Sequence, residues 1–126
     1  MKKELLYGEL SYKIVGLLYK VNDEIGYGQK EKVYCDAFEQ LLKDEGINFK
    51  REHYCPITIS GHVIAKRYFD FLVDDKIIVE FKAGETGFRE VCTQIFQYLK
   101  QSGYKLGLIA RYTKTGVKVK RIPCFY

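Results

Sequence analysis

Residues 67–82 read RYFDFLVDDKIIVEFK, and this stretch decides the fold of the chain. It predicts two short β-strands around the polar turn Asp74-Asp75-Lys76, because Phe, Val and Ile dominate the two flanking runs. Each predicted strand carries one carboxylate among apolar residues, Asp70 in the first and Glu80 in the second. Strand side chains alternate faces, so Glu80 and Lys82 project from one face. The other face carries Ile77, Val79 and Phe81.

The length of the turn determines whether the two carboxylates meet. A two-residue loop would pair Val73 with Lys76 and would place Asp70 opposite Val79. The carboxylates would then lie on opposite faces, because a register slip of one residue inverts every side chain. A three-residue loop instead places Asp70 opposite Glu80. The Asn-Gly or Asp-Gly signal of tight hairpins is absent, so the sequence leaves both loops open.

A carboxylate among apolar strand residues normally needs a partner or a metal ion. Asp70 and Glu80 on one face could share a divalent cation, with the ammonium of Lys82 beside them. These are the groups that metal-assisted hydrolysis of a phosphodiester requires. The alternative is an Asp and a Glu on the solvated face of a hairpin, with Lys82 as their surface partner.

Residues 29–45, QKEKVYCDAFEQLLKDE, predict a helix that ends at Gly46, a typical C-terminal cap residue. Its apolar stripe includes Tyr34, Phe38 and Leu41 and, continued backwards, reaches Glu31. The helix dipole alone favours a Glu in a first turn. Glu31 nevertheless lies on the inward side, just after Gly26-Tyr27-Gly28, and is a candidate to point at whatever that face covers.

A further helix is predicted over residues 89–102. It places Gln94 and Tyr98 four residues apart on one face, near Val91 and Ile95. Taken alone, this pair is typical of core packing with a satisfied amide.

Positive charge gathers near the end of the chain. Residues 111–121 contain five basic residues and no acid: Arg111, Lys114, Lys118, Lys120 and Arg121. The alternation of Val117 and Val119 with Lys118 and Lys120 predicts a half-buried strand with a basic outer face. That face suits a phosphate backbone, and the net charge of +5 is compatible with such a partner. It equally suits an edge strand that lysines protect from aggregation.

Length and composition predict one domain spanning residues 1–126, since the chain is 47% hydrophobic and too short for two cores. No apolar run approaches the roughly 18 residues of a membrane span. The N-terminus lacks the apolar region of a signal peptide. The four cysteines form no C-x-x-C pair, so neither zinc nor a disulfide framework is expected. We therefore expect a cytoplasmic protein with reduced cysteines and no membrane partner.

The predicted elements alternate in a way that indicates an α/β sandwich around a mixed sheet. Helices are expected at residues 9–25, 29–45 and 89–102, with Ile14, Leu17, Leu18, Val21 and Ile25 of the first facing inward. Strands are expected at residues 49–60, 63–73, 77–83, 105–111 and 117–122, with Gly61-His62 as the first turn.

Together these features resemble a known family. The pattern Gly28-x-x-Glu31-x-x-Tyr34 is similar to the signature of the GxxExxY protein family, a branch of the PD-(D/E)xK nuclease superfamily. The resemblance spans residues 10–121 and includes Asp70, Glu80-Phe81-Lys82, Gln94 and Tyr98-Leu99-Lys100. The chain departs from the family at Tyr27, where Pro is common, at Val91, where His is common, and at Tyr68, where Arg is common. The resemblance implies an αβββαβ restriction-endonuclease-like core with an extra N-terminal helix and an extra C-terminal strand.

The resemblance also implies a metal-dependent nuclease that hydrolyses nucleic-acid phosphodiesters, with DNA as the expected partner. Asp70, Glu80 and the Phe81 backbone carbonyl would hold Mg²⁺ or Mn²⁺. Lys82 would position the attacking water and offset developing negative charge. Glu31 would bind a second cation directly or through water. The remaining helix residues, Gln94 and Tyr98, would orient Lys82 or the substrate.

Other functions remain open at this stage. PD-(D/E)xK folds also serve as non-catalytic nucleic-acid-binding modules or as interaction subunits of larger defence or repair complexes, and a homo-oligomer is equally compatible with the sequence. A degenerate binder is expected to lose one of Asp70, Glu80 or Lys82, and this chain keeps all three. The Gln-x-x-x-Tyr spacing is similar to the exonuclease-like branch, which favours ends or single strands over intact duplex.

Overall fold

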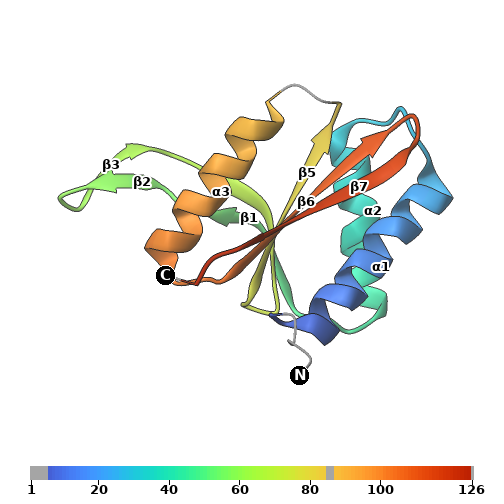
Figure 1. Ribbon diagram of the computed structural model, residues 1–126, viewed down its shortest axis with the longest axis horizontal. Helices are drawn as coiled ribbons and strands as arrows, with labels where there is room; N and C mark the ends of the chain where they lie inside the picture. Colours follow the sequence, from blue (N-terminus) through green and yellow to red (C-terminus); the bar gives the residue numbers. More distant parts are fainter. Residues whose placement is uncertain (1–5, 85–86, 126) are drawn as a thin grey trace.

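The computed structural model describes residues 6–84 and 87–125 and consists of a twisted mixed sheet with helices on both faces (Figure 1). The sheet order is β1-β4-β5-β6-β7, with β5 and β6 parallel and the other pairs antiparallel. The helix α3 makes the crossover between β5 and β6, as a parallel connection requires. This architecture confirms the predicted α/β fold class. The elements are α1 Gly8–Ile25, α2 Glu31–Asp44, β1 Phe49–Tyr54, β2 Ile57–Ile59, β3 His62–Ala65, β4 Tyr68–Val73, β5 Ile77–Ala83, α3 Phe88–Ser102, β6 Leu106–Thr113 and β7 Gly116–Pro123.

Each face of the sheet has its own apolar core. Helices α1 and α2 pack on one face, where Phe38 meets Phe71 and Phe81 edge-on or at a tilt. Helix α3 packs on the other face through Val91, Ile95 and Leu99. It approaches β6 so closely that a Cβ on Gly107 would lie 2.5 Å from Ile95 Cγ2. The two faces alternate along β5 as predicted, with Ile77, Val79 and Phe81 on the α1/α2 side.

The helix faces agree with the sequence pattern except near two helix ends. Ile25, predicted to face inward, is 38% exposed, because α1 ends there and Gly26 (φ 81°) turns the chain away. In α2 the fully buried residue of the last turn is Leu42, and Leu41 is only half-buried. Within the described residues, no helix combines the length and the apolar composition that a bilayer crossing needs.

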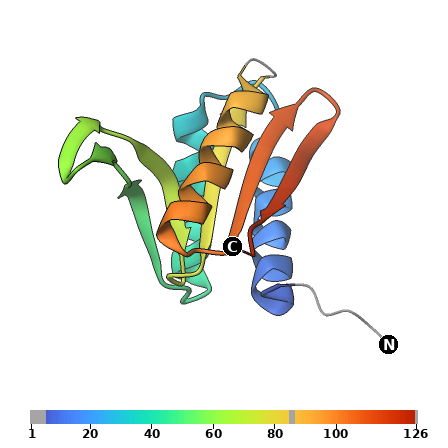
Figure 2. The same cartoon turned by 60° about the vertical axis from the view of Figure 1, so that its left-hand side comes forward.

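The long hairpin predicted over residues 49–73 is divided into two parts. Strands β1 and β4 belong to the main sheet, whereas β2 and β3 form a separate two-stranded sheet that projects from it (Figure 2). The predicted strands at residues 49–60 and 63–73 are therefore wrong as continuous elements. Pro56, which has no N–H for a ladder, stands at the break. There the Cys55 N–H donates to Arg67 O at 2.8 Å, and Arg67 Nε donates back to Cys55 O at 3.1 Å.

The tip of this projecting hairpin also differs from the prediction. Ile59 pairs with His62, so the turn consists of Ser60 and Gly61 rather than Gly61 and His62. Both turn residues have positive φ, 50° and 78°. That is the geometry of the two-residue turns that fit the twist of a hairpin.

Candidate active site at the end of strand β5

The turn between β4 and β5 takes the wider of the two forms that the sequence allowed. The paired residues are Val73 with Ile77, Leu72 with Ile78 and Phe71 with Val79. The loop is therefore the three residues from Asp74 to Lys76, and Asp74 and Asp75 have φ of 52° and 53°. The Lys76 N–H donates to Val73 O at 3.0 Å and closes it. Continued by one step, this register places Asp70 opposite Glu80.

Beyond the last ladder pair of β4 and β5, the side chains of Asp70 and Glu80 accept the backbone hydrogen bonds between the two strands. The last ladder pair is Phe71 with Val79. Beyond it the Asp70 N–H donates to Glu80 Oε1 at 2.8 Å, and the Phe81 N–H donates to Asp70 Oδ2 at 2.7 Å. Each carboxylate thus occupies the place of a ladder carbonyl on the neighbouring strand. The two acids are held together at the point where β4 leaves β5 and turns toward the projecting hairpin.

The alternation of side chains is interrupted at Asp70. Its neighbours Phe69 and Phe71 would share a face in a regular strand, yet they lie in the cores on opposite faces of the sheet. In the neighbouring strand β1, Glu52 has a left-handed φ of 54° and falls between the pairs Arg51–Phe71 and His53–Phe69. Both strands therefore change face at the same level, and Asp70 stands at that change.

The carboxylates of the site influence one another strongly. Burial, followed by the charge of Asp70, raises the pKa of Glu80 to about 9. Burial also raises the pKa of Glu31, which the Lys82 ammonium opposes and the Asp70 charge reinforces. The backbone of Ala83, the last residue of β5, also acts on Glu31 and lowers its pKa. Glu31 of α2 therefore reaches the same site as Asp70 and Glu80.

The tyrosine of the Gly-x-x-Glu-x-x-Tyr pattern explains how Glu31 is held. The Tyr34 hydroxyl donates to Gly26 O at 2.8 Å and accepts from the Gln29 N–H at 3.2 Å. It thereby ties both sides of the loop that leads from α1 into α2. Its ring stacks on Tyr112 of β6, with centroids 4.1 Å apart and planes at 9°. The loop is thus fastened to the sheet, and α2 starts at Glu31.

We expect Tyr34→Phe to lower the free energy of unfolding by about 1 kcal/mol, because one hydroxyl makes both loop hydrogen bonds and the ring packing is kept. Urea denaturation followed by circular dichroism measures this change as a lower midpoint with an unchanged slope. Tyr19→Phe, on the exposed side of α1, is the matched control. An unchanged midpoint for Tyr34→Phe would show that the hydroxyl does not fasten the loop.

Lys82 lies on the α3 face of β5, at the start of that helix. A Cβ on Gly87 would lie 3.6 Å from Lys82 Nζ and 4.0 Å from Glu90 Oε2. These are ordinary contact distances, so glycine is favoured here by its φ of 78° and not by a lack of space. The ammonium is therefore positioned by the sheet on one side and by the first turn of α3 on the other.

A row of basic side chains continues from Lys82 across the sheet. Lys82 pairs with Arg111 of β6, and Arg111 pairs with Lys118 of β7. Paired residues share a face, so Lys82, Arg111 and Lys118, here called the basic row, lie side by side on the α3 face. Lys120 pairs with Ile109 and belongs to the same face. The Arg111 guanidinium lies 4.4 Å from the centroid of the Phe88 ring.

The structure does not bring every predicted residue to this site. The Tyr98 hydroxyl lies 2.7 Å from His53 Nε2, and its ring packs against Phe69, so Tyr98 supports β1 and β4 and does not reach Lys82. Burial raises the pKa of Tyr98 to about 12. Gln94 is exposed on α3, one helical turn from Tyr98 and one from Glu90.

Two residues near the site were not predicted from the sequence. Cys35 is buried one turn after Glu31, and burial followed by the Asp70 charge raises the pKa of its thiol. Glu90 borders the same space as the Lys82 ammonium. Their sequence positions could have indicated both residues. Cys35 is four residues after Glu31 and so lies on the same helix face, and Glu90 stands in the first turn of α3.

The donor atoms at the site suit magnesium or manganese better than a metal that needs an all-protein cage. In the described part of the chain, no three His, Cys, Asp or Glu side chains are grouped to hold a metal ion. Asp70 and Glu80, with the carbonyl of Phe81 directly after Glu80, form a smaller set of hard oxygen donors. Mg²⁺ characteristically binds one or two carboxylates and fills its other positions with water and phosphate. A cation would also offset the effects of burial and of the Asp70 charge, which together raise the pKa of Glu80.

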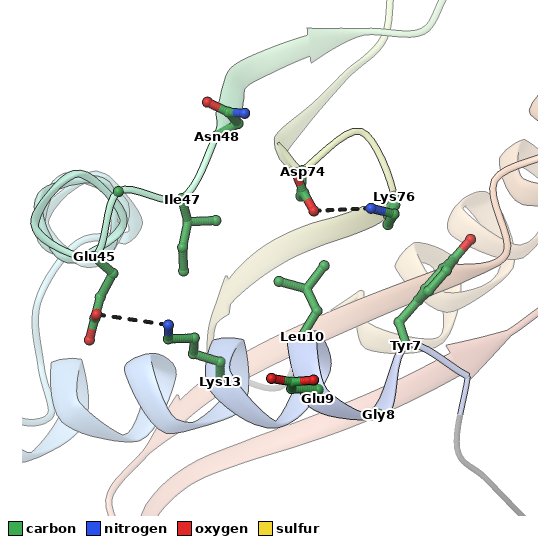
Figure 3. Close-up of a pocket in the computed structure, with 11 residues that line it drawn as sticks. Tyr7, Gly8, Glu9, Leu10, Lys13, Glu45, Ile47, Asn48, Asp74 and Lys76 are labelled. Atoms are coloured by element: carbon green, nitrogen blue, oxygen red, sulfur yellow. Dashed lines mark hydrogen bonds and ion pairs between the residues drawn. The ribbon is translucent and has the colours of Figure 1, made fainter.

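A sizeable pocket lies elsewhere, at the opposite end of the sheet (Figure 3). The start of α1, the loop after α2 and the β4–β5 turn line its volume of about 640 Å³. Four of its charged residues form two pairs: Lys13 lies 4.0 Å from Glu45, and Lys76 lies 3.1 Å from Asp74. This pocket contains none of the grouped carboxylates Glu31, Asp70 and Glu80, so it is not part of the candidate site.

Comparison with known proteins gives a family and a fold. The sequence profile described as the PD-(D/E)XK nuclease superfamily matches residues 8–122. The solved structure entitled "Crystal structure of SSO0001" is similar with a TM-score of 0.55 and 18% identity. That similarity covers 93% of this chain and 59% of the SSO0001 chain, and at this identity it concerns the fold. No curated protein matches the sequence.

Proposed function

The chain belongs to the PD-(D/E)XK nuclease superfamily, and we propose that it is a metal-dependent nuclease that hydrolyses nucleic-acid phosphodiesters, with DNA as substrate. The observation that carries this proposal is the reciprocal bonding of Asp70 and Glu80, with Lys82 two residues further along β5. We assign the chain to the GxxExxY branch on the pattern Gly28-x-x-Glu31-x-x-Tyr34, whose tyrosine fastens the loop before Glu31. The four cysteines, all free, are compatible with a reducing cytoplasm.

Asp70, Glu80 and the Phe81 carbonyl would hold Mg²⁺ or Mn²⁺, and Glu31 would hold a second cation directly or through water. When bound, such a cation lowers the pKa of water and stabilises charge on the phosphate oxygens. Glu80 contributes only after it has lost the proton that burial and Asp70 stabilise. Glu31, whose pKa the Lys82 ammonium lowers and the Asp70 charge raises, would complete the acidic side of the site.

Lys82 is the cationic side of the proposed mechanism. Its ammonium orients the attacking water and offsets the negative charge that develops on the phosphate. Gln94, exposed one turn from Glu90 on α3, is placed to contact the substrate strand rather than the metal. Tyr98 acts through the strands, since its hydroxyl and ring hold His53 and Phe69 in the layer beneath Asp70.

The substrate backbone would follow the basic row away from the carboxylates. Lys82, Arg111 and Lys118 lie in register across three strands, and Lys120 shares their face. A second pocket of about 280 Å³ at the same end of the sheet is bordered by Tyr27, Gly84, Lys114 and Lys118. Among its described lining residues none is acidic, which favours phosphate groups there.

The decisive assay incubates the purified protein with labelled single- and double-stranded DNA and RNA, in Mg²⁺, in Mn²⁺ and in EDTA, beside Asp70→Ala. We expect cleavage in the presence of either cation and none in EDTA or with Asp70→Ala. The four substrates separate DNA from RNA, and end-labelled products separate cleavage at ends from internal cleavage. Binding without cleavage under every condition would instead assign the non-catalytic role, as a nucleic-acid-binding or interaction subunit of a larger defence or repair complex.

We expect Lys118→Ala/Lys120→Ala to weaken nucleic-acid binding and to reduce its salt dependence, because each lost phosphate contact lowers the slope by about one unit. Fluorescence anisotropy across a salt titration, with two unrelated DNA sequences, measures the slope of log affinity against log salt for wild type and for the double variant. Because β7 is an edge strand, the competing explanation is protection of that edge. It predicts unchanged slopes and greater aggregation of the double variant, which light scattering would detect.

A further inference from the structure

The projecting hairpin of β2 and β3 exposes apolar side chains that no part of the described chain covers. Every residue of both strands is exposed, and Ile59 and Ile64 are exposed by 65% and 63%. Ile57 and Val63 are exposed as well. A two-stranded hairpin without a covering layer is only marginally stable in water. Exposed apolar surface of this kind commonly marks a contact site.

The charge around the hairpin indicates what kind of partner it contacts. Residues 53–69 contain no Asp or Glu, although the whole chain has 16. Lys66 and Arg67 stand at the base of the hairpin, and His62 stands next to its tip. Two identical copies of such a surface would bring like charges together, whereas a polyanion complements it. The hairpin therefore suits a nucleic acid better than a second copy of this chain.

An aromatic pair connects the hairpin with the carboxylates. Tyr54 and Tyr68 pair across β1 and β4, with ring centroids 5.1 Å apart, and both rings are exposed. Tyr68 also lines a pocket of about 250 Å³ together with Glu52, Phe69 and Asp70. The chain thus passes from the end of the hairpin at Ala65 to the exposed ring of Tyr68 and then to Asp70, five residues after Ala65. The hydrogen bonds between Cys55 and Arg67 fix the hairpin at its base.

We propose that this surface binds the junction at which a nucleic-acid duplex opens into a single strand. The apolar hairpin would lie against the last base pair, as apolar wedges do where proteins open a base step. The first unpaired base would stack on Tyr68, which would bring the adjoining phosphate to Asp70. Bases offer their flat faces only where the stack is open, so neither intact duplex nor phosphate contacts alone make use of these groups. Binding of the fork does not depend on the proposed nuclease function. Only the expectation that cleavage occurs beside the fork rests on that function.

The test compares binding of a forked duplex, a blunt duplex and a single strand of equal length, by fluorescence anisotropy in EDTA so that no substrate is cut. We expect wild type to bind the forked duplex about tenfold more tightly than either other substrate, as one base–aromatic stack would give. Ile59→Thr/Ile64→Thr and Tyr68→Ala should lose this preference, and Tyr68→Phe should keep it. Threonine remains β-branched, which preserves strand preference. Tyr12→Gln, at an exposed ring on α1, is the control.

A second readout reports stacking itself. With 2-aminopurine as the first unpaired base, wild type and Tyr68→Phe should quench its fluorescence, and Tyr68→Ala should not. Equal binding of all three substrates by wild type, or an unchanged preference in the hairpin variant, would overturn the proposal. So would a wild-type dimer that Ile59→Thr/Ile64→Thr converts to a monomer without loss of fork binding. Fork preference without cleavage in any metal would defeat the proposed nuclease activity and leave this inference standing.

Discussion

Asp70→Asn is expected to reduce metal-dependent cleavage by about a thousandfold, the scale of loss when a group that stabilises transition-state charge is removed. Asparagine keeps the shape of the side chain, and its carbonyl oxygen still accepts the Phe81 N–H. What it removes is the negative charge that Asp70 presents beside Glu80. The variant should therefore fold normally and bind nucleic acid as wild type does. Cleavage rates with saturating enzyme separate this loss from a loss of binding.

Two controls make that result specific to the site. Asp23→Asn, an exposed acid on α1, alters net charge by the same amount and should cleave at the wild-type rate. Lys82→Met, which keeps the length of the side chain and removes the ammonium, should also lose most cleavage. Similar rates for Asp70→Asn and Asp23→Asn would show that the paired carboxylates do not perform the chemistry.

The helices and strands that form the layers of the fold could be predicted from the sequence, because apolar periodicity is a local property of the chain. The predicted strand at residues 77–83 coincides with β5, and α3 differs from its prediction by one residue at its start. Polar residues at regular positions also revealed the face that Glu80 and Lys82 share. These features depend on residues that are close together in the sequence, so the order of apolar and polar residues is enough to predict them.

The register of Asp70 against Glu80 could not be predicted, because it depends on how Asp74 and Asp75 turn. Both adopt positive φ, which an aspartate tolerates but does not demand. The face change at Asp70 was also hidden. It requires the left-handed Glu52 on β1 in register with β4, and strand pairing joins residues far apart in sequence.

Tyr98 shows the limit of reasoning from helix spacing. A four-residue step places Gln94 and Tyr98 on one side of α3, but it does not say how far along the sheet each lies. Tyr98 meets His53 and Phe69 near the base of the hairpin, whereas Lys82 lies at the first turn of the helix. The first turn of α3 therefore lies near Lys82, whereas Tyr98, near its other end, contacts β1 and β4.

The cation should stabilise the folded protein in proportion to its affinity, because a ligand that binds only the native state shifts unfolding by mass action. With Mn²⁺ at about 100 times its dissociation constant, the gain is about 2.7 kcal/mol, which corresponds to a rise in melting temperature of about 10 °C. We expect this rise for wild type and none for Glu80→Gln. The amide keeps an oxygen to accept the Asp70 N–H, and burial already keeps the Glu80 carboxyl protonated at pH 7, so the metal-free variant should be as stable as wild type.

Differential scanning calorimetry at pH 7, with and without Mn²⁺ or Mg²⁺, measures the rise directly. Glu24→Gln on the exposed side of α1 is the matched control and should respond to the cation as wild type does. Because the readout is stability, it tests the metal site even if the right nucleic acid has not been found. A similar rise in all three proteins would mean that the cation binds elsewhere, and the ligand roles of Asp70 and Glu80 would have to be abandoned.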